Sequence, residues 1–192
     1  ACSERNILFV ADEVITGFGR CGDWFASTRY NLEPDMMTVA KGLTSGYCPM
    51  GAVVAAPSVW NEFYREGAGM FRHGFTYGGH ATSAAAGLAN IKIMADERLP
   101  QHVAELEDYF TQAVKSLEDI EVVREVRAGV GFLGAIQLAD PTTAPHWYEK
   151  CREAGVISRA IWTGSLQIAP PLTITKDEID QMVALFRKGL TS

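Results

Sequence analysis

The chain has 192 residues and a formal net charge of −6, with 47% hydrophobic and 21% charged residues. This composition is rich enough in apolar residues to form a core, which excludes an intrinsically disordered chain. The acidic balance, with no basic stripe, excludes a protein that binds the phosphate backbone of nucleic acid.

Apolar runs in the first part of the chain predict three strands. The run NILFVAD, at 6–12, is continuously apolar until its polar end, which is typical of a parallel strand buried on both faces. Two further strands are predicted at 36–40 and 52–56, with glycine-rich loops between them. Because a strand buried on both faces needs neighbours on both sides, we expect the chain to be a piece of a longer protein.

Two helices are predicted in the rest of the first hundred residues. Ser58 is expected to cap a short helix that ends at Gly67. The glycines of 68–80 predict a loop. The small residues of 80–95 predict a helix that packs closely against a neighbour.

After Pro100 the pattern changes to that of an α+β domain. A long amphipathic helix is predicted from apolar residues that share one face, namely Val103, Leu106, Phe110, Val114 and Leu117. Strands are then expected at 121–126, 131–139, 156–161 and 165–169, and a helix near 143–154. Thr175 and Glu178 match a capping box that opens a last helix. We therefore predict an α/β sheet domain at 1–100 and a smaller α+β domain at 101–192.

The stretch GFGRCG, at 17–22, matches the G-x-G-x-x-G pattern of a dinucleotide-binding turn. Asp12 and Glu13 precede these glycines and would repel a diphosphate, and the sequence after Gly22 lacks the small residues that start a phosphate-binding helix. We therefore interpret the glycines as a structural turn. Asp12 ends a strand, where open α/β sheets bind their ligands. It can serve there as a cap, as a metal ligand or as the partner of a cationic atom, although metal binding is disfavoured because Asp12 and Glu13 point to opposite faces.

Lys41 follows another apolar strand and is flanked by small residues that give access to its amine. A lysine shielded from water at this place is a candidate amine nucleophile, and a solvated lysine is the alternative. With Asp12 at the end of another strand, the pair suggests pyridoxal 5′-phosphate (PLP). The aldehyde of PLP reacts with a lysine, and its ring nitrogen needs a carboxylate to stay protonated.

The residues around this pair resemble a known family. The segments DEVITGFGRCGDWFA and PDMMTVAKGLTSGYCPMGAVV, at 12–26 and 34–54, resemble the signature of the class III PLP-dependent aminotransferases, also called ω-aminotransferases. The segments at 73–88 and 166–180 resemble two further blocks of that family. The resemblance implies an α/β fold: the C-terminal part of a fold type I large domain with a mostly parallel sheet, followed by the small α+β domain.

The resemblance also implies roles for single residues. Lys41 forms a Schiff base with PLP and moves a proton between the substrate Cα and the cofactor C4′. Asp12 pairs with the ring nitrogen, and Val14 packs on the ring. Phe75 and Thr76 bind the cofactor phosphate of the partner subunit, which implies a homodimer with shared active sites.

The implied reaction is transamination between an amino donor (an ω-amino acid, an amine or an amino acid) and a 2-oxo acid such as pyruvate. Arg159 matches the arginine that holds a substrate carboxylate in ω-amino acid:pyruvate enzymes, and a surface strand residue is its alternative. Ile15 stands where the acetylornithine and γ-aminobutyrate enzymes often have glutamine, which favours the ω-amino acid or amine:pyruvate branch.

Other readings of the same residues stay open. The scaffold also suits an aminomutase or a decarboxylase, and the chain could be a non-catalytic truncated remnant. The N-terminal half of the family carries a phosphate loop and a residue that stacks on the ring, so we expect this chain alone to be incomplete. The four cysteines form no C-x-x-C pair, no apolar stretch is long enough to span a membrane, and we expect a cytoplasmic protein without a membrane segment or a metal.

Overall fold

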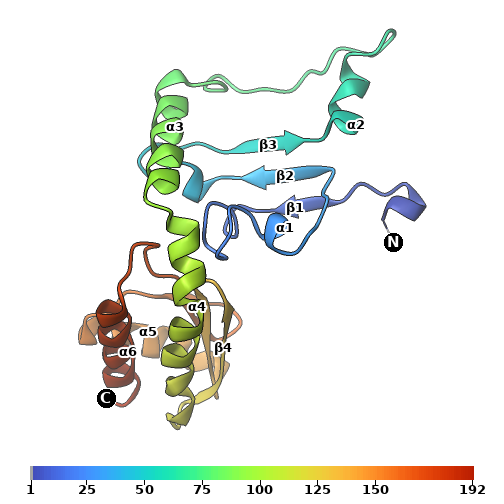
Figure 1. Ribbon diagram of the computed structural model, residues 1–192. Helices are drawn as coiled ribbons and strands as arrows, with labels where there is room; N and C mark the ends of the chain where they lie inside the picture. Colours follow the sequence, from blue (N-terminus) through green and yellow to red (C-terminus); the bar gives the residue numbers. More distant parts are fainter. Residues whose placement is uncertain (1) are drawn as a thin grey trace. The chain divides into compact units, whose positions relative to one another are not determined.

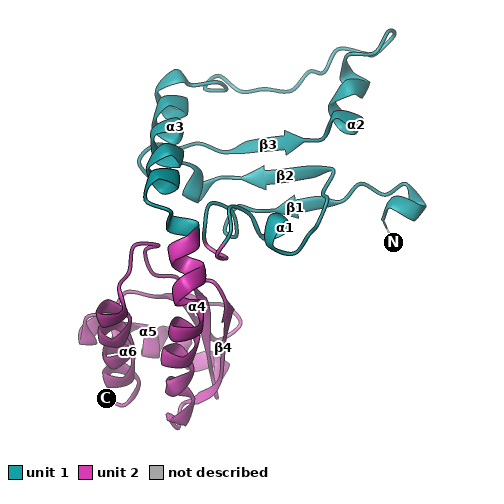
Figure 2. Ribbon diagram, viewed as in Figure 1, with its two compact units in different colours: residues 1–19, 23–100 teal, residues 20–22, 101–192 magenta. Residues whose placement is uncertain are grey.

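The computed structural model describes residues 2–192, which form two compact units (Figures 1 and 2). Unit 1 comprises the residues up to Gly19 together with Asp23–Pro100, and unit 2 comprises Arg20–Gly22 together with Gln101–Ser192. Within residues 2–192, no helix combines the length and the apolar character that crossing a membrane requires.

Unit 1 contains a three-stranded sheet with the strand order β1-β2-β3. β1 (Val10–Asp12) runs parallel to β2 (Met36–Val39), and β2 runs antiparallel to β3 (Ala52–Ala55). Figure 1 shows the three strands side by side. The apolar patterns predicted all three strands, but nothing in them indicated that β3 would be antiparallel. The parallel pair matters most, because residues that follow β1 and β2 lie at one edge of the sheet.

The prediction that the first strand is buried on both faces was wrong for this chain. β1 has only three residues, and Ile7, Leu8 and Val10 are 55%, 56% and 48% exposed. The cause is the strand order, since β1 pairs with β2 alone and no other strand of residues 2–192 lies beside it.

Unit 1 also holds several short helical segments and one long helix. These are η1 (Ser3–Arg5), α1 (Ala26–Arg29), η2 (Lys41–Leu43), α2 (Pro57–Trp60), η3 (Asn61–Phe63) and α3 (Ala81–Asp96). The prediction that Ser58 caps a helix reaching Gly67 was wrong, because Ala56 is the N-cap and Pro57 starts α2. Proline suits the first helical position. Neither α2 nor η3 buries a residue. Tertiary packing therefore does not stabilise a longer helix that would reach Gly67.

α3 packs closely against the segment that follows β2, as its small residues predict. A Cβ on Gly87 would lie 3.6 Å from the Leu43 carbonyl oxygen. The side-chain amide of Asn90 donates to the carbonyls of Gly42 and Leu43, at 2.8 and 3.2 Å. α3 therefore fixes the backbone immediately after Lys41.

Unit 2 contains a four-stranded antiparallel sheet with the order β4-β5-β7-β6. Its strands are β4 (Val123–Val130), β5 (Leu133–Leu138), β6 (Arg159–Ile161) and β7 (Ser165–Ile168). Its helical segments are α4 (Leu99–Lys115), η4 (Ser116–Asp119), η5 (Pro141–Thr143), α5 (Ala144–Ala154) and α6 (Lys176–Leu190). α4 starts at Leu99, and its residues from Gln101 onward belong to unit 2.

The core of unit 2 draws on all of its long elements. Phe110 of α4, Phe132 just before β5 and Phe186 of α6 are almost completely buried, and the rings of Phe110 and Phe132 are 5.2 Å apart. The predicted apolar face of α4 is buried or partly buried, with Leu117 lying in η4. The capping box of Thr175 and Glu178 is confirmed.

β6 is shorter than the predicted strand at 156–161. Gly155 ends α5 with a positive φ of 111°, and the amide of Val156 bonds back to the Cys151 carbonyl at 3.0 Å. These bonds close the helix in the manner of a Schellman end and keep Val156 out of the strand.

Candidate active site

Asp12 and the segment before Lys41 meet at one edge of the unit 1 sheet. Asp12 is the last residue of β1 and pairs in parallel register with Thr38 of β2. Lys41 follows three positions after Thr38, beyond the end of β2. Because both strands run in the same direction, their carboxyl ends bring Asp12 and the backbone that leads into Lys41 to the same edge of the sheet.

The Asp12 carboxylate is held through one of its two oxygens. Oδ1 accepts a hydrogen bond from the Val14 amide at 3.1 Å and another from the Thr38 hydroxyl at 3.0 Å. Among residues 2–192, no hydrogen bond reaches Oδ2. The side chain is exposed in this chain, so one carboxylate oxygen is fixed and the other is available to a ligand.

Glu13 has the opposite environment, because the residue is only 2% exposed. Oε1 accepts hydrogen bonds from the Ser27 amide and hydroxyl, both at 2.6 Å, and Oε2 accepts bonds from the Ala26 amide and the Thr16 hydroxyl. Burial acts to raise the pKa of Glu13, but these hydrogen bonds outweigh it, and the net effect is a lowered pKa. Glu13 therefore stays ionised and joins the turn after β1 to the start of α1.

Sequence reasoning did not assign this function to Glu13. The prediction that Asp12 and Glu13 point to opposite faces is consistent with their burial, since Asp12 is exposed and Glu13 is buried. The partners of Glu13 are two amides and two hydroxyls that lie up to fourteen positions away, and no spacing motif marks them.

Lys41 starts η2, one residue after the end of β2, and has a positive φ of 40°. Left-handed backbone is unfavourable for a side chain of this kind, and strained residues often lie at functional sites. Of the two alternatives for Lys41, shielded from water or solvated, the second describes this chain, in which its side chain is exposed. Among residues 2–192, no hydrogen bond or ion pair involves its amine.

The glycines of the opening motif form a turn. A Cβ on Gly17 would lie 2.7 Å from the Glu13 carbonyl oxygen, and Gly19 and Gly22 have φ values of 91° and 81°. Arg20, between them, belongs to unit 2, where its guanidinium donates to the carbonyls of Phe132 and Pro170 at 3.2 and 2.6 Å. Burial lowers the pKa of Arg20. The motif therefore shapes the chain, in agreement with the prediction of a structural turn.

The other predicted site residues lie on three different segments. Val14 is half-buried and lies two positions after the last residue of β1. Phe75 and Thr76 are exposed in the turn before α3, where the Gly78 amide donates to the Phe75 carbonyl at 2.9 Å. Arg159 is exposed at the start of β6 in unit 2, in register with Gln167. The described hydrogen bonds thus connect two of the predicted site residues, Asp12 and Val14, and they connect Thr38 to the same carboxylate.

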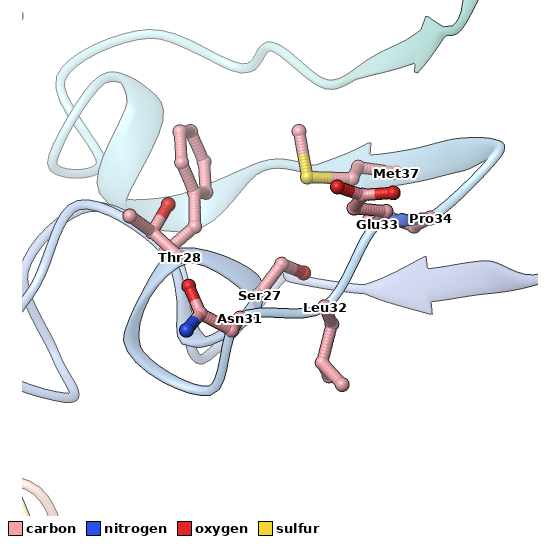
Figure 3. A pocket seen from close by; sticks show the side chains of 8 residues that line it. Ser27, Thr28, Asn31, Leu32, Glu33, Pro34 and Met37 are labelled. Carbon is pink, nitrogen blue, oxygen red and sulfur yellow. The ribbon is translucent and has the colours of Figure 1, made fainter.

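A surface hollow of about 440 Å³ in unit 1 lies away from these residues. Figure 3 shows side chains from α1, from the following loop and from β2 around it, and the lining residues are Phe25, Ser27, Thr28, Asn31, Leu32, Glu33, Pro34 and Met37. None of the predicted site residues lines this hollow. The candidate site is therefore the strand edge with Asp12 and Lys41.

Comparison with known proteins gives consistent matches along the whole chain. Residues 1–190 match the family described as aminotransferase class III. The chain is 43% identical to the putrescine–pyruvate aminotransferase of Pseudomonas aeruginosa, over 98% of this chain and 43% of that protein. It is 40% identical to the diaminobutyrate–2-oxoglutarate transaminase of Halomonas elongata, over 95% of this chain and 42% of that protein.

Solved structures agree with this assignment. An amine transaminase from an uncultivated Pseudomonas species, in its PLP-bound form, matches with a TM-score of 0.92 and 35% identity, over 99% of this chain and 46% of that chain. The expected α/β fold, that of a transaminase, is thereby confirmed. The chain spans less than half of the length of each of these relatives. It belongs to the class III aminotransferases.

Proposed function

We propose that the protein to which this chain belongs uses PLP to move an amino group from an amino donor to a 2-oxo acid such as pyruvate. The observation that carries the proposal is the parallel pairing of β1 and β2, with Asp12 in register with Thr38. The aldehyde and the nitrogen of PLP lie on opposite sides of one ring. A site for this cofactor therefore needs an amine and a carboxylate at one edge of the protein, which these strands supply.

The groups at this edge suit the cofactor. Asp12 Oδ1 already has two donors, so Oδ2 is the oxygen that would accept the N–H of a protonated ring nitrogen. Lys41 carries an amine that no other group among residues 2–192 engages, and this amine would bind the aldehyde carbon. Val14, held next to Asp12 by its own amide, would pack on the ring.

When bound, PLP acts as an electron sink that stabilises negative charge on the carbon next to the substrate nitrogen. Asp12 holds the proton on the ring nitrogen. The Lys41 amine, at the carboxyl end of β2, moves the proton at the substrate Cα. Arg159, whose guanidinium is exposed at the start of β6, binds a substrate carboxylate.

We further propose a homodimer in which Phe75 and Thr76 bind the cofactor phosphate of the partner subunit. The segment around these residues supports this proposal, because it exposes large apolar side chains: Trp60, Phe63, Tyr64, Met70, Phe71 and Tyr77. Exposed apolar surface of this extent commonly marks an interface. In this assignment residues 1–100 belong to the PLP-binding large domain, and residues 101–192 form the small domain.

Two substitutions test the cofactor site. Both are made in the full-length protein that the gene encodes. Lys41→Ala should abolish covalent attachment of PLP, detected by borohydride reduction and peptide mapping, and should slow transamination by about 10²–10⁴-fold. Asp12→Asn should leave PLP attached to Lys41 but slow turnover by several orders of magnitude, because the ring nitrogen loses its anionic partner.

Matched controls come from α3, where Lys92 and Asp96 form an exposed ion pair. Lys92→Ala and Asp96→Asn change the same residue types at the surface and should keep wild-type turnover. Normal turnover in Asp12→Asn, or PLP attached to a lysine other than Lys41, would refute the assignment.

A donor panel tests the reaction. Because two relatives are named for putrescine with pyruvate and for diaminobutyrate with 2-oxoglutarate, these four compounds form the first panel. We expect the amino group to appear on the 2-oxo acid. We also expect pyruvate to be a better acceptor than 2-oxoglutarate, because Ile15 favours the pyruvate-dependent branch of the family. Migration of the amino group within the donor would indicate an aminomutase, and release of CO₂ a decarboxylase.

A further inference from the structure

The Thr38 hydroxyl is the one side-chain group among residues 2–192 that donates a hydrogen bond to the Asp12 carboxylate. We propose that Thr38 is a positioning residue of the PLP site: it fixes Asp12 through Oδ1 and so leaves Oδ2 to bind the ring nitrogen. This inference rests on the proposed function and adds a residue to which neither the sequence motif nor the comparisons give a role.

The sheet register provides the first step of the argument. Asp12 and Thr38 are paired residues of adjacent parallel strands, and the 3.0 Å hydrogen bond joins their side chains across the pair. The amide of Glu13 also donates to the Thr38 carbonyl at 2.9 Å. Thr38 is therefore anchored to the backbone next to Asp12 as well as to its carboxylate.

The exposure of Asp12 explains why such a bond is needed. An exposed side chain changes rotamer within picoseconds to nanoseconds unless hydrogen bonds hold it. The Val14 amide and the Thr38 hydroxyl both reach Oδ1, from the chain after β1 and from β2 respectively. Two donors that converge on one oxygen from different segments restrict the rotation of the carboxylate.

Other hydroxyls near this position have different partners. Thr16 donates to the Glu13 carboxylate, and its other contact at this place is the Asp12 main-chain carbonyl, at 3.5 Å. A threonine also has few side-chain rotamers in a strand, because it is branched at Cβ. Thr38 thus presents its hydroxyl to Asp12 from a rigid position.

The test compares Thr38→Val, Thr38→Ser and a matched control, each in the full-length protein that the gene encodes. Valine keeps the shape and the β propensity of threonine but removes the hydroxyl. We expect Thr38→Val to lower kcat by roughly tenfold, the effect of one lost hydrogen bond to a charged group, with an unchanged KM for the amino donor. The dissociation constant of PLP should also rise. Thr38→Ser should restore both quantities.

Thr142→Val is the control, because Thr142 likewise donates its hydroxyl to an aspartate Oδ1, that of Asp140, at 2.7 Å on the surface of unit 2. It should keep the wild-type kcat and PLP affinity. If the wild type carries PLP on Lys41 but Thr38→Val behaves like Thr142→Val, the positioning role is refuted and the proposed function stands. If the wild type carries no PLP on Lys41, the proposed function fails, and this inference fails with it.

Discussion

Two adjacent carboxylates at the end of β1 have different environments. Asp12 is exposed and keeps one oxygen available, whereas Glu13 is buried and accepts hydrogen bonds from Thr16, Ala26 and Ser27. Neighbouring side chains of an extended chain point to opposite faces, which is consistent with the exposure of Asp12 and the burial of Glu13. Glu13 therefore stabilises the turn that supports Asp12, without itself being available to a ligand.

Glu13→Gln should lower the free energy of unfolding of this chain by about 1–3 kcal/mol at pH 7, because an amide group would face the donors of Ala26 and Ser27. The effect should depend on pH. The folded-state pKa of Glu13 is below its ordinary value of 4.5, so its stabilisation is complete above about pH 4.5 and is lost as the pH falls through the folded-state value.

Urea unfolding at pH 7 and at acidic pH measures this dependence. The difference between wild type and Glu13→Gln should be large at pH 7 and shrink upon acidification. Glu33→Gln, at an exposed glutamate, should unfold like the wild type at both pH values. A difference that stays constant with pH would contradict the role assigned to the ionised Glu13.

At the scale of elements, the turn between β4 and β5 depends on the tripeptide Arg20–Gly22. The Phe132 amide donates to the Arg20 carbonyl at 3.0 Å, and the Gly131 amide donates to the Glu107 carboxylate. Gly131 has a φ of 50°, and a Cβ there would lie 2.1 Å from the Arg20 carbonyl oxygen. The hairpin therefore needs a glycine for two reasons, its backbone conformation and its contact with Arg20.

The contribution of the contact can be isolated with a neighbouring glycine. Gly129 also has a positive φ, 124°, but a Cβ there would meet no atom within 4 Å. Gly129→Ala should cost about 1–3 kcal/mol of unfolding free energy from backbone strain alone. Gly131→Ala should cost about 1–3 kcal/mol more, from overpacking. Thermal or urea unfolding of the two variants measures the difference, and equal losses would refute the contact.

The sequence predicts elements well where one local pattern determines them. The capping box at Thr175 and Glu178 and the apolar face of α4 were both correct, because each depends on spacing within one helix. The exposure of β1 was not predictable, since it depends on which strands lie beside it. Among the site residues, Asp12 and Lys41 stand at strand ends that the sequence marks. The hydrogen bond from Thr38 depends on the β1–β2 register, which the sequence does not encode locally.

At the scale of the whole chain, burial is concentrated in unit 2. Its core joins α4, α5, α6 and the four strands, with Phe110, Phe132 and Phe186 almost completely buried. Each side chain of this size contributes about 1.5–3 kcal/mol when it is fully buried. In unit 1 the buried apolar residues are fewer, and the segment that contains Phe63, Met70 and other large side chains is exposed. We therefore expect unit 1 to be the less stable part of this chain when it is studied alone.

Alkylation of the cysteines can measure the unfolding of the two units separately. Cys48 is half-buried in unit 1, whereas Cys151 is completely buried in unit 2, and burial raises the pKa of its thiol to about 11. Since the thiolate is the reactive form, Cys151 should resist alkylation until unit 2 unfolds. In a urea series read by mass spectrometry of labelled peptides, Cys48 should react at lower urea than Cys151, with exposed Cys2 labelled throughout. Labelling of Cys48 and Cys151 over the same urea range would mean that the units unfold together, and the stability difference argued from burial would then be wrong.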